Sequence, residues 1–198
     1  KCFCVSFAEP RDADWCVENA QSVLFDNGAF TFHRLRAAIP NWTGYYEWLE
    51  PYLGHPHWAI VPDVIDGTES DNLTLAREWP HRRDCAAPVW HLGESLEQLG
   101  RLLDLDFGRV CFGSSGAYWQ VGSESWERRC DEAFNFLSQR GKLPWVHMLR
   151  GLSLCGDRWP FASADSTNVA RNHASQKVCP ERMARRIDSV QCPIFWTK

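Results

Sequence analysis

The chain has 198 residues, 44% of them hydrophobic and 23% charged, a composition typical of a folded domain rather than of a disordered segment. Its 21 lysines and arginines against 25 aspartates and glutamates give a net charge of −4, which excludes a globally basic nucleic-acid coat protein. No apolar stretch approaches the roughly 18–20 residues that a membrane span needs, and no leader precedes the first apolar segment. We therefore expect one domain over residues 1–198 and no membrane association.

The nine cysteines are scattered along the chain, and only Cys2 and Cys4 lie close together. No Cys-x-x-Cys pair is matched by a second pair or by spaced histidines, so a zinc site is not predicted. The pair His55 and His57 flanks a proline and has no third ligand nearby, which indicates a loop. These patterns favour a reduced, cytoplasmic protein without a bound metal.

Short apolar segments rich in β-branched and aromatic residues recur along the chain and predict strands that are buried on both faces. They cover residues 2–7, 23–25, 58–61, 87–91, 109–112, 145–149 and 161–164. Helical spacing of apolar residues appears between them, around 45–52, 96–103 and 126–137, with Thr43 and Ser125 as expected caps. This alternation predicts a parallel α/β protein. Two architectures fit: a compact (β/α)8 barrel with one strand missed, and an open doubly wound sheet.

Polar residues follow nearly every predicted strand. These strand ends are Asp26-Asn27-Gly28, Pro62-Asp63, His91, Gly113-Ser114-Ser115-Gly116, Arg150-Gly151 and Asp165-Ser166-Thr167. Ligands of parallel α/β folds bind at the carboxyl ends of strands. Because six such ends would converge, the pattern favours a barrel mouth over an open-sheet crevice.

Three aspartates are the main candidates for chemistry. Asp26 and Asp165 each follow an apolar segment, and two carboxylates in unequal environments can divide the roles of nucleophile and general acid/base. Either could instead cap a turn or a helix. Asp63 lies within an apolar run, where a carboxylate needs partners, and it could pair with the N1–H and amino donors of a guanine-like base or form a structural salt bridge.

Two further strand ends offer weaker candidates. The turn from Gly113 to Gly116 could present backbone N–H groups to a carbonyl or phosphate oxygen, or could be an ordinary tight turn. It lacks the lysine of a P-loop. His91 could donate to a base carbonyl or serve as a structural histidine.

The ordered strand ends resemble those of the tRNA-guanine and related deazaguanine transglycosylases. Asp26-Asn27-Gly28-Ala29-Phe30 is similar to the family's Asp-Ser-Gly-Gly-Phe/Tyr signature. The later segments that resemble family strands, in the same order, are Pro62-Asp63, Trp90-His91-Leu92-Gly93, Cys111-Phe112-Gly113-Ser114-Ser115-Gly116, His147-Met148-Leu149-Arg150-Gly151 and Ala164-Asp165-Ser166. The resemblance covers about residues 22 to 172.

The resemblance implies a (β/α)8 barrel that exchanges guanine for a 7-deazaguanine in a polynucleotide. Asp165 would attack the sugar C1′ to give a covalent intermediate, and Asp26 would shuttle the proton. The residues that it implies for substrate binding are Asp63, Asn27, Gly28, Phe30, His91, Gly113, Ser114, Ser115 and Arg150. No cofactor is required, because exchange conserves one glycosidic bond.

The chain departs from the tRNA-modifying members of that family, since it is much shorter and lacks their cysteine- and histidine-bound zinc. Compact members thought to insert a base such as preQ0 into phage or island DNA fit better, so DNA is expected over tRNA, with the free deazaguanine base as second substrate. His91 and Asn27 replace family residues, which leaves the accepted base open. The alternatives are an N-glycosidase or nucleoside hydrolase with the same carboxylates and a non-enzymatic nucleobase- or nucleotide-binding protein.

Overall fold

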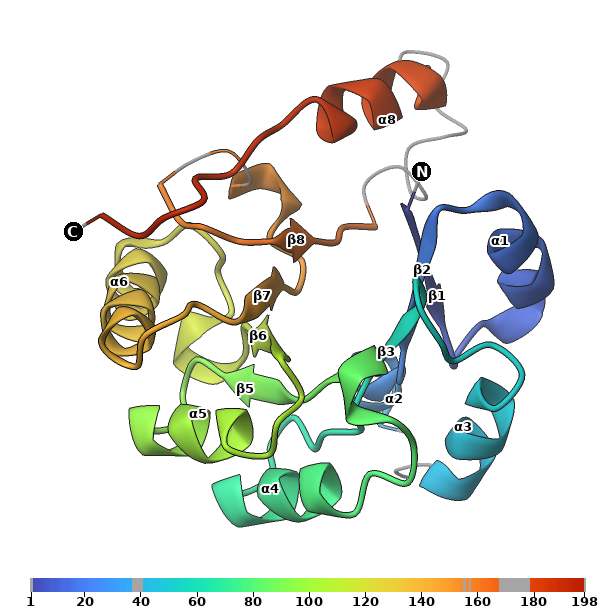
Figure 1. Ribbon diagram of the computed structural model, residues 1–198, viewed down its shortest axis with the longest axis horizontal. Helices are drawn as coiled ribbons and strands as arrows, with labels where there is room; N and C mark the ends of the chain where they lie inside the picture. The colour runs from blue at the N-terminus through green and yellow to red at the C-terminus, as the bar shows by residue number, and fades with distance from the viewer. Residues whose placement is uncertain (1, 37–40, 155, 157, 168–178, 198) are drawn as a thin grey trace.

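The computed structural model describes residues 2–36, 41–154, 156, 158–167 and 179–197. Its strands form two four-stranded parallel sheets, ordered β1-β2-β3-β4 and β5-β6-β7-β8 (Figure 1). The strands are β1 Cys2–Ser6, β2 Ser22–Asp26, β3 Trp58–Ile60, β4 Ala86–Ala87, β5 Val89–His91, β6 Arg109–Gly113, β7 Trp145–Met148 and β8 Ser163–Ala164.

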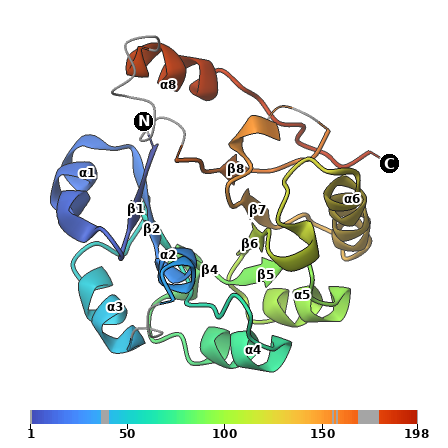
Figure 2. The ribbon, with the colours of Figure 1, turned by 180° about the vertical axis from the view of Figure 1, so that it is seen from behind.

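The strands of the two sheets curve around one interior and form an open ring (Figures 1 and 2). Most helices lie outside this ring, but α2 lies across one of its ends. The α-helices are α1 Ala13–Asn19, α2 Ala29–Arg34, α3 Trp42–Leu49, α4 Glu69–Arg77, α5 Leu96–Leu103, α6 Glu124–Gln139 and α8 Pro180–Asp188. Short 3-10 helices are η1 Pro10–Asp12, η2 Arg83–Cys85, η3 Gly116–Tyr118 and η4 Leu152–Leu154. None of the helices in the described ranges is long and apolar enough to cross a membrane.

A single proline separates the two sheets, since β4 ends at Ala87 and β5 begins at Val89. The Val61 N–H donates to the Ala87 carbonyl and the Cys111 N–H donates to the Pro88 carbonyl, both at 2.9 Å. This segment therefore hydrogen-bonds with chain on both sides, and the strands follow one another in sequence order. A doubly wound sheet would reverse its strand order. Within the described residues no ladder joins β8 to β1, so the fold is parallel α/β without a demonstrated barrel closure.

Side chains of successive strand residues point to opposite sides, and this alternation divides the core in two. On β2, Val23 and Phe25 belong to the larger cluster, which packs the strands against helices α3 to α6. Leu24 belongs to a smaller cluster inside the ring, whose buried members are Leu24, Trp58, Ile60, Ala87, Val89 and Cys111. The inner cluster fills the space beneath the carboxyl ends of the strands.

The predicted strands and helical segments all occur, with small differences at their boundaries. The predicted strand 87–91 is divided at Pro88, which has no N–H to donate to a ladder. The expected caps were wrong by two residues. Asn41 caps α3 by accepting from the Thr43 N–H, and Ser123 caps α6 by accepting from the Trp126 N–H.

Candidate active site at the carboxyl ends of the strands

Asp26 is held at the end of β2 by its neighbours on two sides. Parallel pairing sets Ser6 of β1 opposite Asp26, and the Ser6 hydroxyl donates to Asp26 Oδ2 at 2.7 Å. The Gly28 N–H donates to the same oxygen at 3.2 Å. Gly28 has a φ of +78°, and a Cβ there would lie 3.1 Å from the Ala8 nitrogen, so glycine is required on both counts. No hydrogen bond from a described residue to Oδ1 accompanies these two.

The environment of Asp26 raises the pKa of its carboxyl to about 6. Burial is the largest cause, and the hydrogen bonds from Ser6 and Gly28 oppose it. The negative charges of Asp165 and Asp63 raise the pKa further. A carboxyl of this kind can both accept and release a proton near neutral pH, as general acid/base catalysis requires.

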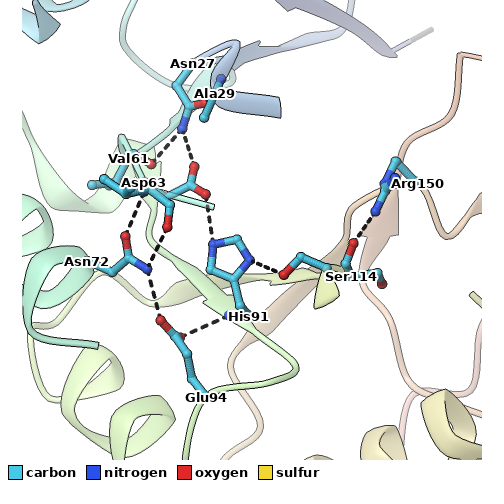
Figure 3. Close-up of polar contacts among 11 residues, drawn as sticks. Asn27, Ala29, Val61, Asp63, Asn72, His91, Glu94, Ser114 and Arg150 are labelled. Atoms are coloured by element: carbon cyan, nitrogen blue, oxygen red, sulfur yellow. Dashed lines mark hydrogen bonds and ion pairs between the residues drawn. The ribbon is translucent and has the colours of Figure 1, made fainter. Parts of the chain in front are cut away.

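Asp63 lies beyond β3 and has partners for both oxygens (Figure 3). The Asn27 amide donates to Asp63 Oδ1 at 2.8 Å, and His91 Nε2 lies 2.9 Å from Oδ2. Asn27 also donates to the Val61 carbonyl and accepts from the Ala29 N–H. Asp63 is 6% exposed and His91 5%. The expectation that this buried carboxylate needs partners is therefore confirmed, whereas its reading of a base stays a prediction.

His91 connects the Asp63 region to the glycine-rich turn. Burial lowers the pKa of His91, but the hydrogen bond and the charge of Asp63 outweigh it, so the net pKa is raised. The Ser115 hydroxyl lies 3.4 Å from the other ring nitrogen, Nδ1. A Cβ at Gly113 would lie 2.9 Å from that Nδ1, so only glycine leaves room for the ring.

Two polar residues that were not predicted from the sequence, Asn72 and Glu94, hydrogen-bond to the backbone next to Asp63 and at His91 (Figure 3). Glu94 accepts the His91 backbone N–H at 3.0 Å and the Asn72 amide at 3.0 Å. Asn72, on α4, in turn accepts the Val64 N–H at 2.8 Å. Both side chains are buried, so the chain after β3 is tied to the end of β5. Only Glu94, three residues after His91, stands near a predicted strand end.

Asp165 and Arg150 meet at the ends of β8 and β7. The Arg150 N–H donates to Asp165 Oδ1 at 2.7 Å, and Arg150 adopts a left-handed φ of +59°. The Arg150 guanidinium donates to the Ser114 carbonyl and lies 4.5 Å from the centre of the Phe30 ring on α2. Arg150 therefore connects the ends of β6, β7 and β8, and its contact with Phe30 holds α2 beside these strand ends.

Ser114 does not present its side chain to the site. Its hydroxyl accepts the indole N–H of Trp126 at 2.9 Å, and the residue is 4% exposed. The hydroxyl thus anchors α6, and only the carbonyl contacts a predicted site residue. Substrate binding through this hydroxyl is not supported by its orientation.

Asp26, Asp63 and Asp165 all lie close enough to the buried Cys111 for their charges to act on its thiol. Burial raises the pKa of the Cys111 thiol inside the ring, and the charges of Asp165, Asp63 and Asp26 raise it further. The three carboxylates therefore lie in the same part of the molecule, around Cys111. The structure brings together the predicted residues Asp26, Asp63 and Asp165, together with Asn27, Gly28, Phe30, His91, Gly113, Ser115 and Arg150.

A cavity of about 650 Å³ opens beside Asp63. Its lining is Ala29, Phe32, His33, Arg34, Arg36, Trp42, Asp63, Val64, Ile65 and Asp66. Aromatic, acidic and basic side chains thus surround one space large enough for a nucleoside-sized ligand. A smaller cavity of about 260 Å³ borders His91, Glu94 and Ser115.

One group among the described residues brings three possible metal ligands together: His55, Asp84 and Cys85. It is separate from the residues of the candidate site. Arg82 donates to both oxygens of Asp84, at 3.0 and 2.5 Å, and this pairing lowers the pKa of Asp84 to about 2. The carboxylate is therefore already neutralised by an arginine.

No protein-family model and no curated protein sequence matches this chain.

Proposed function

We propose that this protein is a base-exchange transglycosylase that replaces guanine by a 7-deazaguanine in a polynucleotide, DNA in preference to tRNA. The observation that carries the proposal is the buried Asp26 carboxyl, whose pKa is raised to about 6 by burial and by the nearby charge of Asp165. Two carboxylates with different environments suit a covalent glycosyl transfer. The sequential strand order and the outer helices support a (β/α)8-type barrel as the scaffold.

In the proposed reaction Asp165 is the nucleophile. Its Oδ1 accepts a hydrogen bond from the Arg150 N–H, which leaves Oδ2 as the attacking oxygen in this proposal. Oδ2 attacks C1′ of the sugar, the C1′–N9 bond breaks, and its electron pair leaves with guanine. Asp26, protonated at this stage, gives its proton to the departing guanine and becomes ionised. Asp26 removes the proton of the incoming deazaguanine, whose nitrogen then attacks C1′ and releases Asp165.

Asp63 supplies base recognition in this proposal. Asn27 and His91 each use one lone pair on its two oxygens, and the remaining lone pairs accept the N1–H and amino group of a guanine-type base. Arg34 and Arg36 line the same cavity and suit contacts with backbone phosphates.

The test is mass spectrometry of nucleosides from total DNA and total tRNA of cells that express the wild type or Asp165→Asn. The expected result is a 7-deazaguanine nucleoside in DNA with the wild type alone. Release of free guanine without incorporation would replace exchange by hydrolysis. No change in either nucleic acid, with a deazaguanine supply verified, would remove the assignment.

A further inference from the structure

His147, a buried histidine of β7, has no role in the proposed reaction. It is 2% exposed, and the parallel register sets it between Cys111 of β6 and Ser163 of β8. Its ring meets the Trp58 ring edge-on at 5.2 Å, so the side chain points into the ring of strands. Its Nε2 is buried and makes no hydrogen bond with the part of the chain that the structure describes.

The other ring nitrogen of His147 ends a chain of polar contacts. The Trp145 indole N–H donates to the Ser163 hydroxyl oxygen at 3.0 Å, and that oxygen lies 2.7 Å from His147 Nδ1. An indole nitrogen can only donate, so the serine oxygen accepts from it. The serine proton is then available to His147 Nδ1.

The direction of Nε2 decides which ring nitrogen carries the proton. Nε2 lies 3.4 Å from Asp165 Oδ1, an ion-pair distance longer than an ordinary hydrogen bond. A lone pair on Nε2 would face the carboxylate and repel it, whereas an N–H would attract it. The favourable arrangement is therefore Ser163 O–H to Nδ1, with an N–H on Nε2 near Asp165 Oδ1, at a distance that allows electrostatic attraction without a hydrogen bond.

We infer that His147 is a positioning residue for Asp165, held by Ser163 and Trp145 so that its Nε2–H lies near Oδ1 and Asp165 attacks through Oδ2. This inference rests on the proposed function. His147 keeps its proton throughout. Its effect is largest when the ester breaks, because the C1′–O electron pair then returns to Asp165, and the Nε2–H stabilises the returning carboxylate.

The kinetic test compares three variants in exchange of radiolabelled guanine into duplex DNA, with the covalent sugar adduct quantified by intact-protein mass spectrometry after acid quench. His147→Leu should lower kcat at least tenfold, leave KM for guanine within twofold and raise the adduct fraction. His147→Gln, whose amide can place an N–H near the Nε2 position, should retain most activity. His57→Gln is the control. His57 accepts a hydrogen bond from the Val23 N–H at the amino ends of the strands, away from Asp165.

Equal losses in His147→Leu and His147→Gln, or a lowered Tm with unchanged kcat, would overturn the inference. Should His147→Leu fail to fold, Ser163→Ala provides the same comparison, with a smaller expected loss of kcat. The ¹⁵N shifts of His147 in the wild type give a measurement independent of activity. They should report a protonated Nε2 that responds to Asp165→Asn, and an unprotonated Nε2 would refute the inference. A wild type without exchange or adduct would instead reject the proposed function alone.

Discussion

The Asp63 region and the Asp26–Asp165 region differ in how completely their carboxylates are paired. Asn27 and His91 pair with the two oxygens of Asp63. Glu94 accepts the His91 backbone N–H and is itself hydrogen-bonded by Asn72. In contrast, the described hydrogen bonds to the Asp26 side chain are both made to Oδ2, and the Arg150 N–H and His147 Nε2 both lie against Oδ1 of Asp165. A carboxylate paired through both oxygens suits recognition, and one whose described hydrogen bonds all go to a single oxygen suits bond making.

The largest effect is expected from Asp165→Asn, which removes the proposed nucleophile. An amide is a poor nucleophile, so exchange of labelled guanine should fall by several orders of magnitude. The amide oxygen can still accept the Arg150 N–H, so the circular dichroism spectrum should not change. Near-normal exchange would assign the nucleophile to another residue.

Asp26→Asn should abolish exchange and stabilise the fold. The raised pKa means that the folded state binds this proton more tightly than the unfolded chain between about pH 4 and 6. Stability contributed by this group therefore falls as pH rises through that window. The variant should gain about 1–2 kcal/mol at pH 7, less than the ~3 kcal/mol that two pKa units give, because the side chain is partly solvent-accessible.

Urea denaturation at pH 4 and pH 7 measures this difference, which should vanish at pH 4. In the wild type, kcat should fall on both sides of an apparent pKa near 6, because Asp26 must be protonated when guanine leaves and ionised when the deazaguanine loses its proton. A variant less stable than wild type at pH 7 would contradict the burial argument.

Asp63→Ala tests the recognition side. Loss of a buried charged partner should weaken binding of preQ0 or guanine by roughly 2–4 kcal/mol. The wild type should not bind adenine measurably, because adenine lacks the amino donor beside N1. Calorimetry with the three bases measures both effects. Equal affinity for adenine, or unchanged affinity in the variant, would make Asp63 purely structural.

The smallest effect is expected from Gly113→Ala, which moves His91 without removing a charge. The new Cβ would lie 2.9 Å from His91 Nδ1, so the ring must shift away from Asp63. The pKa of His91, followed by NMR, should then fall toward its ordinary value. Gly93→Ala is a matched control, since a Cβ there meets nothing within 4 Å. An unchanged His91 pKa would show that the turn adapts.

The strands and their polar ends were predictable because apolar runs and the residues after them are local features. Asp26, Asp63 and Asp165 were identified in this way, and the structure brings them together. The pairing of Asn27 and His91 with Asp63 was not predictable, since it depends on which strands are neighbours. The use of the Ser114 hydroxyl by Trp126 was missed for the same reason, because a serine in a glycine-rich turn gives no sign of its direction.

Pro88 has a consequence for assembly of the site. It divides the chain between sheet β1–β4, which carries Asp26, and sheet β5–β8, which carries the end that leads to Asp165. Neither half contains both acids. A nascent or partly unfolded chain with one sheet formed would thus be chemically inert toward nucleic acid, and under the proposed function competence would arise only when both halves have docked. Fragments split at this point should each lack activity and regain it only on reassociation.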